Sequence, residues 1–260
     1  MARIYPLFSS SSGNCTYVGD EKSGVLIDAG VSCKRIVTAL EDRSIPLGAV
    51  RGIFVTHTHS DHISGLKVLS KKLNVPVFAQ ETNLRILAES DKVFIGCTLK
   101  GTDEGPVTAG DIRVTGFETL HDTPASCGYK IELPSGRVCA VCTDLGRVTS
   151  SVHDNLKDCS LVLLESNYDE DMLRTGPYDY ALKQRISSDH GHLSNDSCGR
   201  ELCRLVEEGV CRFILGHLSP HNNTPEKAES SAVRYLEKYV RGEDYLLTVA
   251  SPEGTRTVVF

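Results

Sequence analysis

Short apolar runs rich in branched side chains recur along this chain, and each one ends in a polar residue that can bind a metal ion or a proton. Runs of this length and composition predict buried β-strands. If these strands share sheets, the polar residues at their ends gather along one edge. The five runs, each with the polar residue that follows it, are 51–55 before His57, 112–117 before His121, 138–142 before Asp144, 161–164 before Glu165 and 212–215 before His217.

Between these runs, the apolar residues are spaced as on one face of a helix. The last helical segment has Thr224 as a plausible N-cap and Pro225 at its first position. Two more strands are expected near the C-terminus, at 245–249 and 255–260, joined by a turn that contains Pro252. Strands in both halves of the chain with helices outside them predict a layered α/β architecture. The predicted helices are 32–41, 63–73, 81–90, 196–208 and 225–240.

The composition is compatible with one large domain or two small ones. Hydrophobic residues make up 40% of the 260 residues, and no apolar run approaches the roughly 20 residues that cross a membrane. The start of the chain lacks the apolar region of a signal peptide, so we expect a cytoplasmic protein without membrane association. The net charge of −6 gives no global attraction for a polyanion, and any contact with nucleic acid must therefore be local.

Ten cysteines would permit disulfides, but without an export signal we expect them to be reduced. The only CxxC pair is Cys139 and Cys142, within a predicted strand, where residues three apart face opposite sides of the sheet. We therefore expect no disulfide and no cysteine ligand, and interpret most of the thiols as small core residues.

Residues 57–62, with the sequence HTHSDH, are the strongest chemical signal in the chain. Residues two apart at a strand end point the same way, so His57 and His59 can bind one ion together. Asp61 and His62 then lie on the turn, where they can serve a second ion. Imidazole and carboxylate groups suit Zn, Mn or Fe. A chance cluster of polar residues in a loop is the alternative, which three histidines and one aspartate between a strand and a helix disfavour.

The order HxHxDH, then His121, Asp144 and His217, resembles the metallo-β-lactamase fold over nearly the whole chain. The resemblance implies a four-layer αββα sandwich, with residues 1–260 forming a single domain and two metal ions bound at the edge of its sheets. His57, His59 and His121 would hold one ion; Asp61, His62 and His217 would hold the other; and Asp144 would bridge them. Taken alone, His121 reads as a surface or core residue and Asp144 as a turn cap.

The remaining histidines are assigned differently. His153, His190 and His221 lie in a helix start and in polar loops, and we expect them at the surface rather than at a metal. Glu165 either orients a ligand or forms a salt bridge. A pair of divalent ions beside two aspartates leaves the site positively charged, which favours hydrolysis of an anionic ester or of a carbonyl that develops negative charge. The ligands do not specify the substrate.

Three further segments narrow the choice. FSSSSGN (8–14) is a hydroxyl-rich turn, GHLSN (191–195) precedes a predicted helix whose free N–H groups could contact phosphate, and HLSPHNN (217–223) precedes the last helix. Ordinary turns and N-capping by Ser194 or Asn195 are the alternatives. Together with ESNYD (165–169), these segments resemble the WalJ/YycJ-type exonucleases, although Ser10 stands where that family more often has glycine.

This closer resemblance implies a 5′→3′ DNA exonuclease that uses Mn or Zn. His192 would contact the scissile phosphate and act with Asp61 as a catalytic residue, while Ser12 and Asn14 would bind substrate. The basic side chains of Arg174, Lys183 and Arg185 could follow the nucleic-acid backbone or form a solvated face. Two other functions remain open: a glyoxalase-type thioesterase, which shares the ligand set, and a metal-binding regulatory protein with little turnover.

Overall fold

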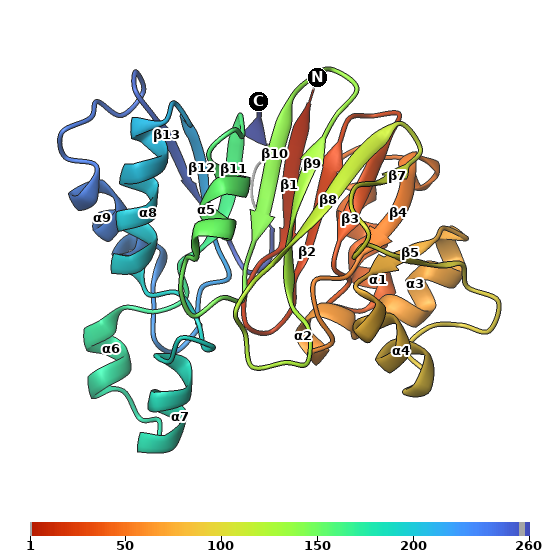
Figure 1. Ribbon diagram of the computed structural model, residues 1–260, viewed down its shortest axis with the longest axis horizontal. Coiled ribbons are helices and arrows are strands. Elements are labelled where there is room, and N and C mark those ends of the chain that lie inside the picture. Colours follow the sequence, from red (N-terminus) through yellow and green to blue (C-terminus); the bar gives the residue numbers. More distant parts are fainter. Residues whose placement is uncertain (1, 255–257) are drawn as a thin grey trace.

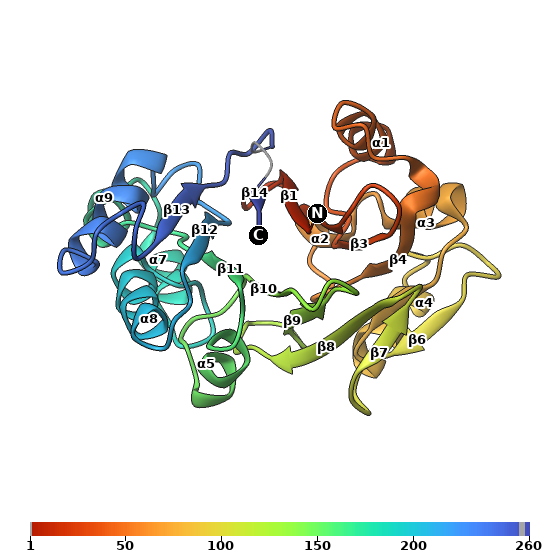
Figure 2. The same cartoon turned by 90° about the horizontal axis from the view of Figure 1, so that it is seen from above.

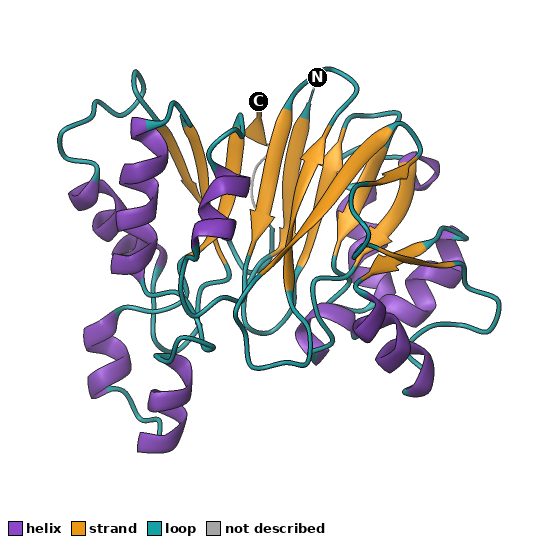
Figure 3. Ribbon diagram, in the orientation of Figure 1, coloured by secondary structure: helices purple, strands orange, loops and turns teal. Residues whose placement is uncertain are grey.

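The computed structural model describes residues 2–254 and 258–260. Two sheets pack face to face in the middle of the molecule, and helices cover the outer face of each (Figures 1 and 3). Figure 2 shows this layering from above, with α1, α3 and α4 over one sheet and α5, α8 and α9 over the other. The predicted αββα sandwich is confirmed.

The first sheet is built from the N-terminal half of the chain and one C-terminal strand. Within the described residues its order is β14-β1-β2-β3-β4-β5-β6, with β3 to β6 parallel. Its strands are β1 (Arg3–Phe8), β2 (Cys15–Gly19), β3 (Gly24–Ile27), β4 (Val50–Phe54), β5 (Val77–Ala79), β6 (Leu99–Gly101) and β14 (Val258–Val259). Its helices are α1 (Cys33–Glu41), η1 (Leu47–Ala49), α2 (Ser60–Ile63), α3 (Leu66–Leu73) and α4 (Glu81–Glu89).

The second sheet has the order β13-β12-β11-β10-β9-β8-β7 within the described residues, with β10 to β13 parallel. Its strands are β7 (Val107–Ala109), β8 (Ile112–Glu118), β9 (Cys127–Glu132), β10 (Val138–Cys142), β11 (Leu161–Glu165), β12 (Arg212–Gly216) and β13 (Leu246–Val249). The helices of this half are α5 (Ser150–Leu156), α6 (Glu170–Thr175), α7 (Tyr180–Ile186), α8 (Asn195–Glu207) and α9 (Pro225–Tyr235).

Three apolar cores hold the four layers together. Successive side chains of a strand point to opposite faces, so Leu26 packs under the first helical layer whereas Ile27 packs between the sheets. Cys139 lies in the core between the sheets and Cys142 in the core under α5 and α8, on opposite faces as predicted. Because both faces of each sheet are covered, the strands read as nearly continuous apolar runs.

Several elements differ from the prediction. The helix expected at 63–73 begins only at Leu66, as α3, and Ile63 is instead the last residue of the short helix α2. Between the two helices lies Gly65, where an added Cβ would lie 2.0 Å from the carbonyl oxygen of Val31. The last helix ends at Tyr235 rather than at residue 240. The terminal runs 245–249 and 255–260 contribute to different sheets, through β13 and β14, and residues 255–257 of the second run lie outside the described part.

Two predictions about side chains have different outcomes. His153 is buried rather than at the surface, because its Nδ1 lies 2.6 Å from Oε1 of the buried Glu201, on α8. His190 and His221 are exposed as expected. All ten cysteines are free thiols, seven of them buried. Over the described residues, the longest and most apolar helices fall short of what a membrane crossing requires.

Helices α6 and α7 form a hairpin that the sequence did not predict. It follows β11 and precedes α8, and it projects from the body at the sheet edge where the predicted ligands lie (Figure 1). Leu173 is its one buried side chain in α6, and α7 has none.

Candidate metal centre

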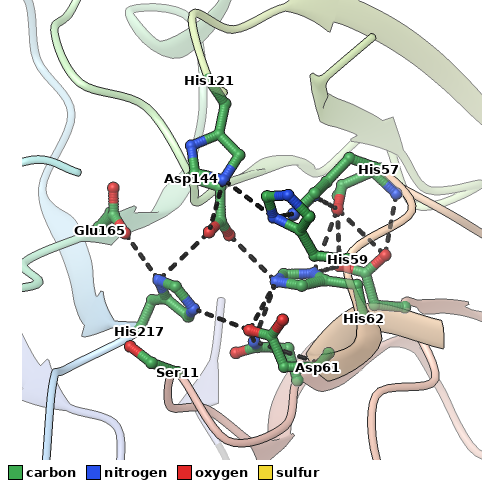
Figure 4. A network of polar contacts seen from close by, with 12 residues as sticks. Ser11, His57, His59, Asp61, His62, His121, Asp144, Glu165 and His217 are labelled. Atoms are coloured by element: carbon green, nitrogen blue, oxygen red, sulfur yellow. Dashed lines mark hydrogen bonds and ion pairs between the residues drawn. The ribbon is translucent and has the colours of Figure 1, made fainter. Parts of the chain in front are cut away.

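All seven predicted ligands converge at one edge of the sandwich, where loops from both sheets meet (Figure 4). They come from four separate parts of the chain: 57–62 after β4, His121 after β8, Asp144 after β10 and His217 after β12. One local expectation was wrong. Because β4 ends at Phe54, His57 and His59 lie in a loop rather than on a strand, and Asp61 and His62 lie in the short helix α2.

The first group of ligand atoms consists of three imidazole nitrogens. Nδ1 of His59 lies 3.0 Å from Nε2 of His57 and 3.3 Å from Nε2 of His121. Burial lowers the pKa of His57 well below its usual value, and burial and the nearby His121 also lower that of His59. Both imidazoles therefore favour the neutral form, which is the form that binds metal ions.

The second group combines carboxylates and imidazoles. Oδ2 of Asp61 lies 3.4 Å from Nε2 of His62 and 3.6 Å from Nε2 of His217. Asp144 lies between the two groups, with Oδ2 3.2 Å from Nε2 of His62 and Oδ1 3.7 Å from Nε2 of His121. This central position is the one that the resemblance gives to a bridging ligand.

Two buried atoms of this centre lack a hydrogen-bond partner among the described residues: Oδ2 of Asp144 and Nε2 of His217. Their contacts to Nε2 of His62 at 3.2 Å and to Oδ2 of Asp61 at 3.6 Å are ion pairs without hydrogen-bond geometry. An unsatisfied buried polar group costs roughly 1–3 kcal/mol, and a metal ion would satisfy both atoms. Burial opposes ionisation of Asp144, yet the imidazoles of His217 and His62 hold its pKa well below the usual value. The Asp144 carboxylate is thus anionic, and, although burial opposes their protonation, it in turn raises the pKa of both imidazoles, that of His217 to about 10. A divalent ion at these atoms would supply the same positive charge. The His/Asp groups are suited to binding divalent metal ions.

Groups behind the ligands fix their orientation, as is usual around metal sites. Oδ2 of the buried Asp28 lies 2.7 Å from Nδ1 of His62, and its Oδ1 accepts the backbone N–H of Thr56 at 2.9 Å. The carbonyl oxygen of Gly191 lies 3.0 Å from Nδ1 of His121. Asp28 was not predicted from the sequence, although this acidic residue follows the apolar strand β3 in the same way that the predicted ligands follow their strands.

Glu165 holds two imidazoles at once. Its Oε1 lies 2.6 Å from Nδ1 of His217 and 2.9 Å from Nδ1 of His192, and its Oε2 accepts the backbone N–H groups of Leu145 and Leu193. Burial raises the pKa of Glu165, but the imidazoles of His192 and His217 outweigh burial and lower it to about 2. Asp144, Glu165, His192 and His217 also offer a possible metal group, but both Glu165 oxygens already accept hydrogen bonds. Glu165 therefore forms salt bridges and at the same time holds the predicted ligand His217, so that both alternatives from the sequence apply.

Three residues of the centre have left-handed backbones. The φ angles are 63° at Asp28, 59° at Asp144 and 56° at His217, and each residue follows a strand. Non-glycine residues adopt this region rarely, and such strain concentrates at functional sites. The turn at each strand end directs the side chain back towards the centre.

A cleft of about 300 Å³ opens beside the centre. Ser12, His192 and Arg185 line it, with Arg185 paired to Asp122. Asn14 does not line it: this side chain is buried, and its Nδ2 donates to the carbonyl oxygen of Ser10 at 3.0 Å and lies 3.1 Å from Nε2 of His62. The structure therefore brings Ser12 to the cleft and the Asn14 amide against the ligand atoms of Asp61 and His62.

The GHLSN segment presents a side chain to the cleft rather than a row of backbone amides. The N–H of His192 donates to the carbonyl oxygen of Ile186, that of Leu193 to Glu165, and that of Asn195 to the carbonyl oxygen of Tyr168. Ser194 caps α8 by accepting from the N–H of Ser197. The expected phosphate contact through these amides is therefore not available, and the imidazole of His192 is the group that faces the cleft.

The fold and the cluster of histidines and aspartates define a protein of the metallo-β-lactamase class, and the model of the β-lactamase superfamily domain matches residues 24–217. The chain is 35% identical to exodeoxyribonuclease YycJ of Bacillus anthracis, covering 89% of this chain and 88% of the relative. It is 34% identical to exodeoxyribonuclease WalJ of Streptococcus pneumoniae, covering 88% and 86%. The chain belongs to the β-lactamase superfamily and, within it, to the family of YycJ and WalJ.

A solved structure supports the fold independently. Zinc-bound PqqB of Methylobacterium extorquens superposes with a TM-score of 0.74 over 99% of this chain and 100% of PqqB, at 16% sequence identity.

Proposed function

We propose that this protein is a dinuclear metal-dependent hydrolase that cleaves phosphodiester bonds of DNA as a 5′→3′ exonuclease. The observation that carries the hydrolase assignment is the convergence of seven ligand side chains on a centre whose buried Asp144 Oδ2 and His217 Nε2 have no hydrogen-bond partner among the described residues. When bound, divalent ions supply a Lewis acid and a water nucleophile that is active near neutral pH.

We divide the seven ligands into two groups, and the distances between their donor atoms support this division. His57, His59 and His121 would hold one ion, and Asp61, His62 and His217 the other. Asp144 would contribute to both because it lies within 3.7 Å of His121 and His62. The nitrogen and oxygen donors favour Zn or Mn, with Fe also compatible.

His192 is the side chain that we assign to the substrate. Glu165 holds its Nδ1, which leaves Nε2 as the atom that a phosphate oxygen can reach. Burial lowers the pKa of His192, but the Glu165 carboxylate more than offsets burial and raises it. A protonated imidazole in the cleft can neutralise a phosphate oxygen or donate a proton to a leaving oxygen. Ser12 would add a hydroxyl contact, and Asp61 would act in catalysis through the centre that it helps to form.

The polynucleotide substrate rests on the family. YycJ and WalJ are named exodeoxyribonucleases, and the similarity extends over nearly nine tenths of this chain. We propose the same substrate here, with residues 1–260 acting as one domain in the cytoplasm. We do not assign Asn14 to the substrate, because that side chain is buried and does not line the cleft.

The deciding experiment uses protein reconstituted separately with Zn and Mn. It is incubated with a small phosphodiester reporter, with 5′-labelled and 3′-labelled DNA, and with a glutathione thioester. We expect mononucleotides to be released from the 5′ end, and a metal content close to two ions per chain. Thioester turnover without phosphodiester turnover would replace this proposal with glyoxalase-type chemistry, and metal binding without any turnover would support a regulatory role.

A further inference from the structure

Helix α7 lies between two cavities of the protein surface. The residues Tyr178, Leu182, Arg185 and Ile186 line the cleft beside the metal centre. The opposite side of the helix faces a second cavity of about 650 Å³ that lies between α6 and α7. On this side the cavity is lined by Tyr180, Lys183 and Gln184 of α7 and by Ser187, which caps its C-terminal end. Their i, i+3, i+4, i+7 spacing places them on one face of the helix.

This helix is unusual because none of its residues is buried. Tyr180 exposes 77% of its surface, although large aromatic side chains normally gain stability by burial. Burial of apolar side chains therefore does not explain why α7 lies beside the cleft of the metal centre. An exposed aromatic ring at a cavity is instead typical of surfaces on which an unpaired base stacks.

The charges around the second cavity favour a base over a phosphate group. Arg174 and Lys183 are offset by Glu170 and Asp171, and Arg174 forms an ion pair with Asp171 at 2.8 Å. Nζ of Lys183 donates to the carbonyl oxygen of Arg174 at 2.9 Å. A cavity with balanced charges exerts little attraction on a phosphate, whereas the Gln184 amide and the ring of Tyr180 suit a neutral, flat group with polar edges.

We propose that the cavity between α6 and α7 binds an unpaired nucleobase of the substrate strand, with Tyr180 as its stacking platform. The scissile phosphate lies in the cleft on one side of α7, and the strand crosses the helix so that a neighbouring base enters the cavity on the other side. A paired base cannot enter a cavity without leaving its duplex, so the site selects single-stranded DNA near the cleaved bond. This inference rests on the proposed nuclease function.

The test compares substrates that reach the cavity with substrates that do not. KM and kcat are measured for a dinucleotide and for a single-stranded octanucleotide, using wild-type protein, Tyr180→Ala and Tyr180→Phe. We expect Tyr180→Ala to raise KM for the octanucleotide about tenfold, the scale of one lost stacking contact, and to change KM for the dinucleotide far less. Tyr180→Phe keeps the ring and should retain the wild-type KM. Ile95→Ala removes a fully exposed side chain elsewhere and serves as the matched control.

Binding is measured separately so that the result does not depend on turnover. An octanucleotide with phosphorothioate linkages carries 2-aminopurine at successive positions, because the fluorescence of this base is quenched when it stacks. We expect quenching at one preferred position, and its loss in Tyr180→Ala. Unchanged quenching and KM in Tyr180→Ala, equal losses for dinucleotide and octanucleotide, or a lower KM for blunt duplex than for single strands would each overturn the inference. If wild-type protein cleaves no phosphodiester, the proposed function fails, while quenching still decides whether the cavity binds a base.

Discussion

His192 and His217 share one oxygen atom of Glu165: their Nδ1 atoms lie 2.9 Å and 2.6 Å from Oε1. A predicted metal ligand and the predicted substrate-binding histidine are thus fixed by a single buried carboxylate. A substitution at Glu165 should therefore affect the proposed metal ligand His217 and the proposed substrate-binding residue His192 together.

Glu165→Gln should lower phosphodiester turnover by about 10–100-fold, the usual scale for losing an orienting partner behind a metal ligand. The amide oxygen of glutamine retains an acceptor but lacks the negative charge. Glu201→Gln is the matched control, because Glu201 is equally buried and pairs with His153 away from the centre. The prediction is checked by measuring kcat for both variants. A kcat in Glu165→Gln equal to that of wild-type protein would contradict it.

His192→Ala should leave the metal content unchanged and lower phosphodiester turnover by roughly 10²–10⁴, the scale of a lost acid–base or oxyanion contact. Metal analysis and kcat are measured on the same preparation. Loss of an ion from this variant would make His192 a ligand and would change the division of ligands given above.

Asp144→Ala should reduce the occupancy of both metal ions together, because Asp144 lies between the two ligand groups. Elemental analysis after reconstitution measures the change. Asp154→Ala, which removes an exposed aspartate paired with Lys157, should retain wild-type metal content. Loss of one ion alone would exclude Asp144 as a bridging ligand.

Gly30→Ala should destabilise the loop that carries the ligands. A Cβ at Gly30 would lie 1.6 Å from the carbonyl oxygen of Asp61, whereas a Cβ at Gly48 would meet no atom within 4 Å. We expect Gly30→Ala to cost about 1–3 kcal/mol in unfolding free energy, as overpacking does, and to weaken metal binding. Gly48→Ala should do neither. Denaturant unfolding and metal titration measure both effects, and identical behaviour of the two variants would show that the loop accommodates the methyl group.

Thiol titration should distinguish buried from accessible cysteines. Burial raises the pKa of Cys127 and Cys159 to about 12, so at neutral pH these thiols are protonated and slow to react as well as covered. In folded protein we expect reaction to be confined to the half-buried Cys97, Cys203 and Cys211, and all ten thiols to react after denaturation without reductant. A persistent deficit of two thiols would reveal a disulfide or a bound metal.

The apolar runs of the sequence predicted a layered α/β architecture and the polar candidates at the sheet edge, because both depend on local pattern. The four-layer sandwich and the set of seven ligands were implied by the resemblance to the metallo-β-lactamase fold. Strand periodicity and burial on two faces produce apolar runs, and the polar residue that ends each run lies at the sheet edge whatever the rest of the chain does. For this reason His57, His121 and His217 could be expected at the same edge although they are far apart along the chain, whereas their assignment as ligands came from the resemblance.

Tertiary structure alone decided which side chains support the centre and which face the substrate. Asp28 meets His62 across 34 positions, His153 meets Glu201 across 48, and Glu165 meets His217 across 52. Contacts of this kind leave no periodic signal, because they depend on how separate loops meet after the sheets have packed. The burial of Asn14 and the position of α7 between two cavities have the same origin. The local sequence pattern determines which polar side chains lie at the edge of the sheets. Packing of the loops from the two sheets determines which of these side chains contact one another and which line the cleft.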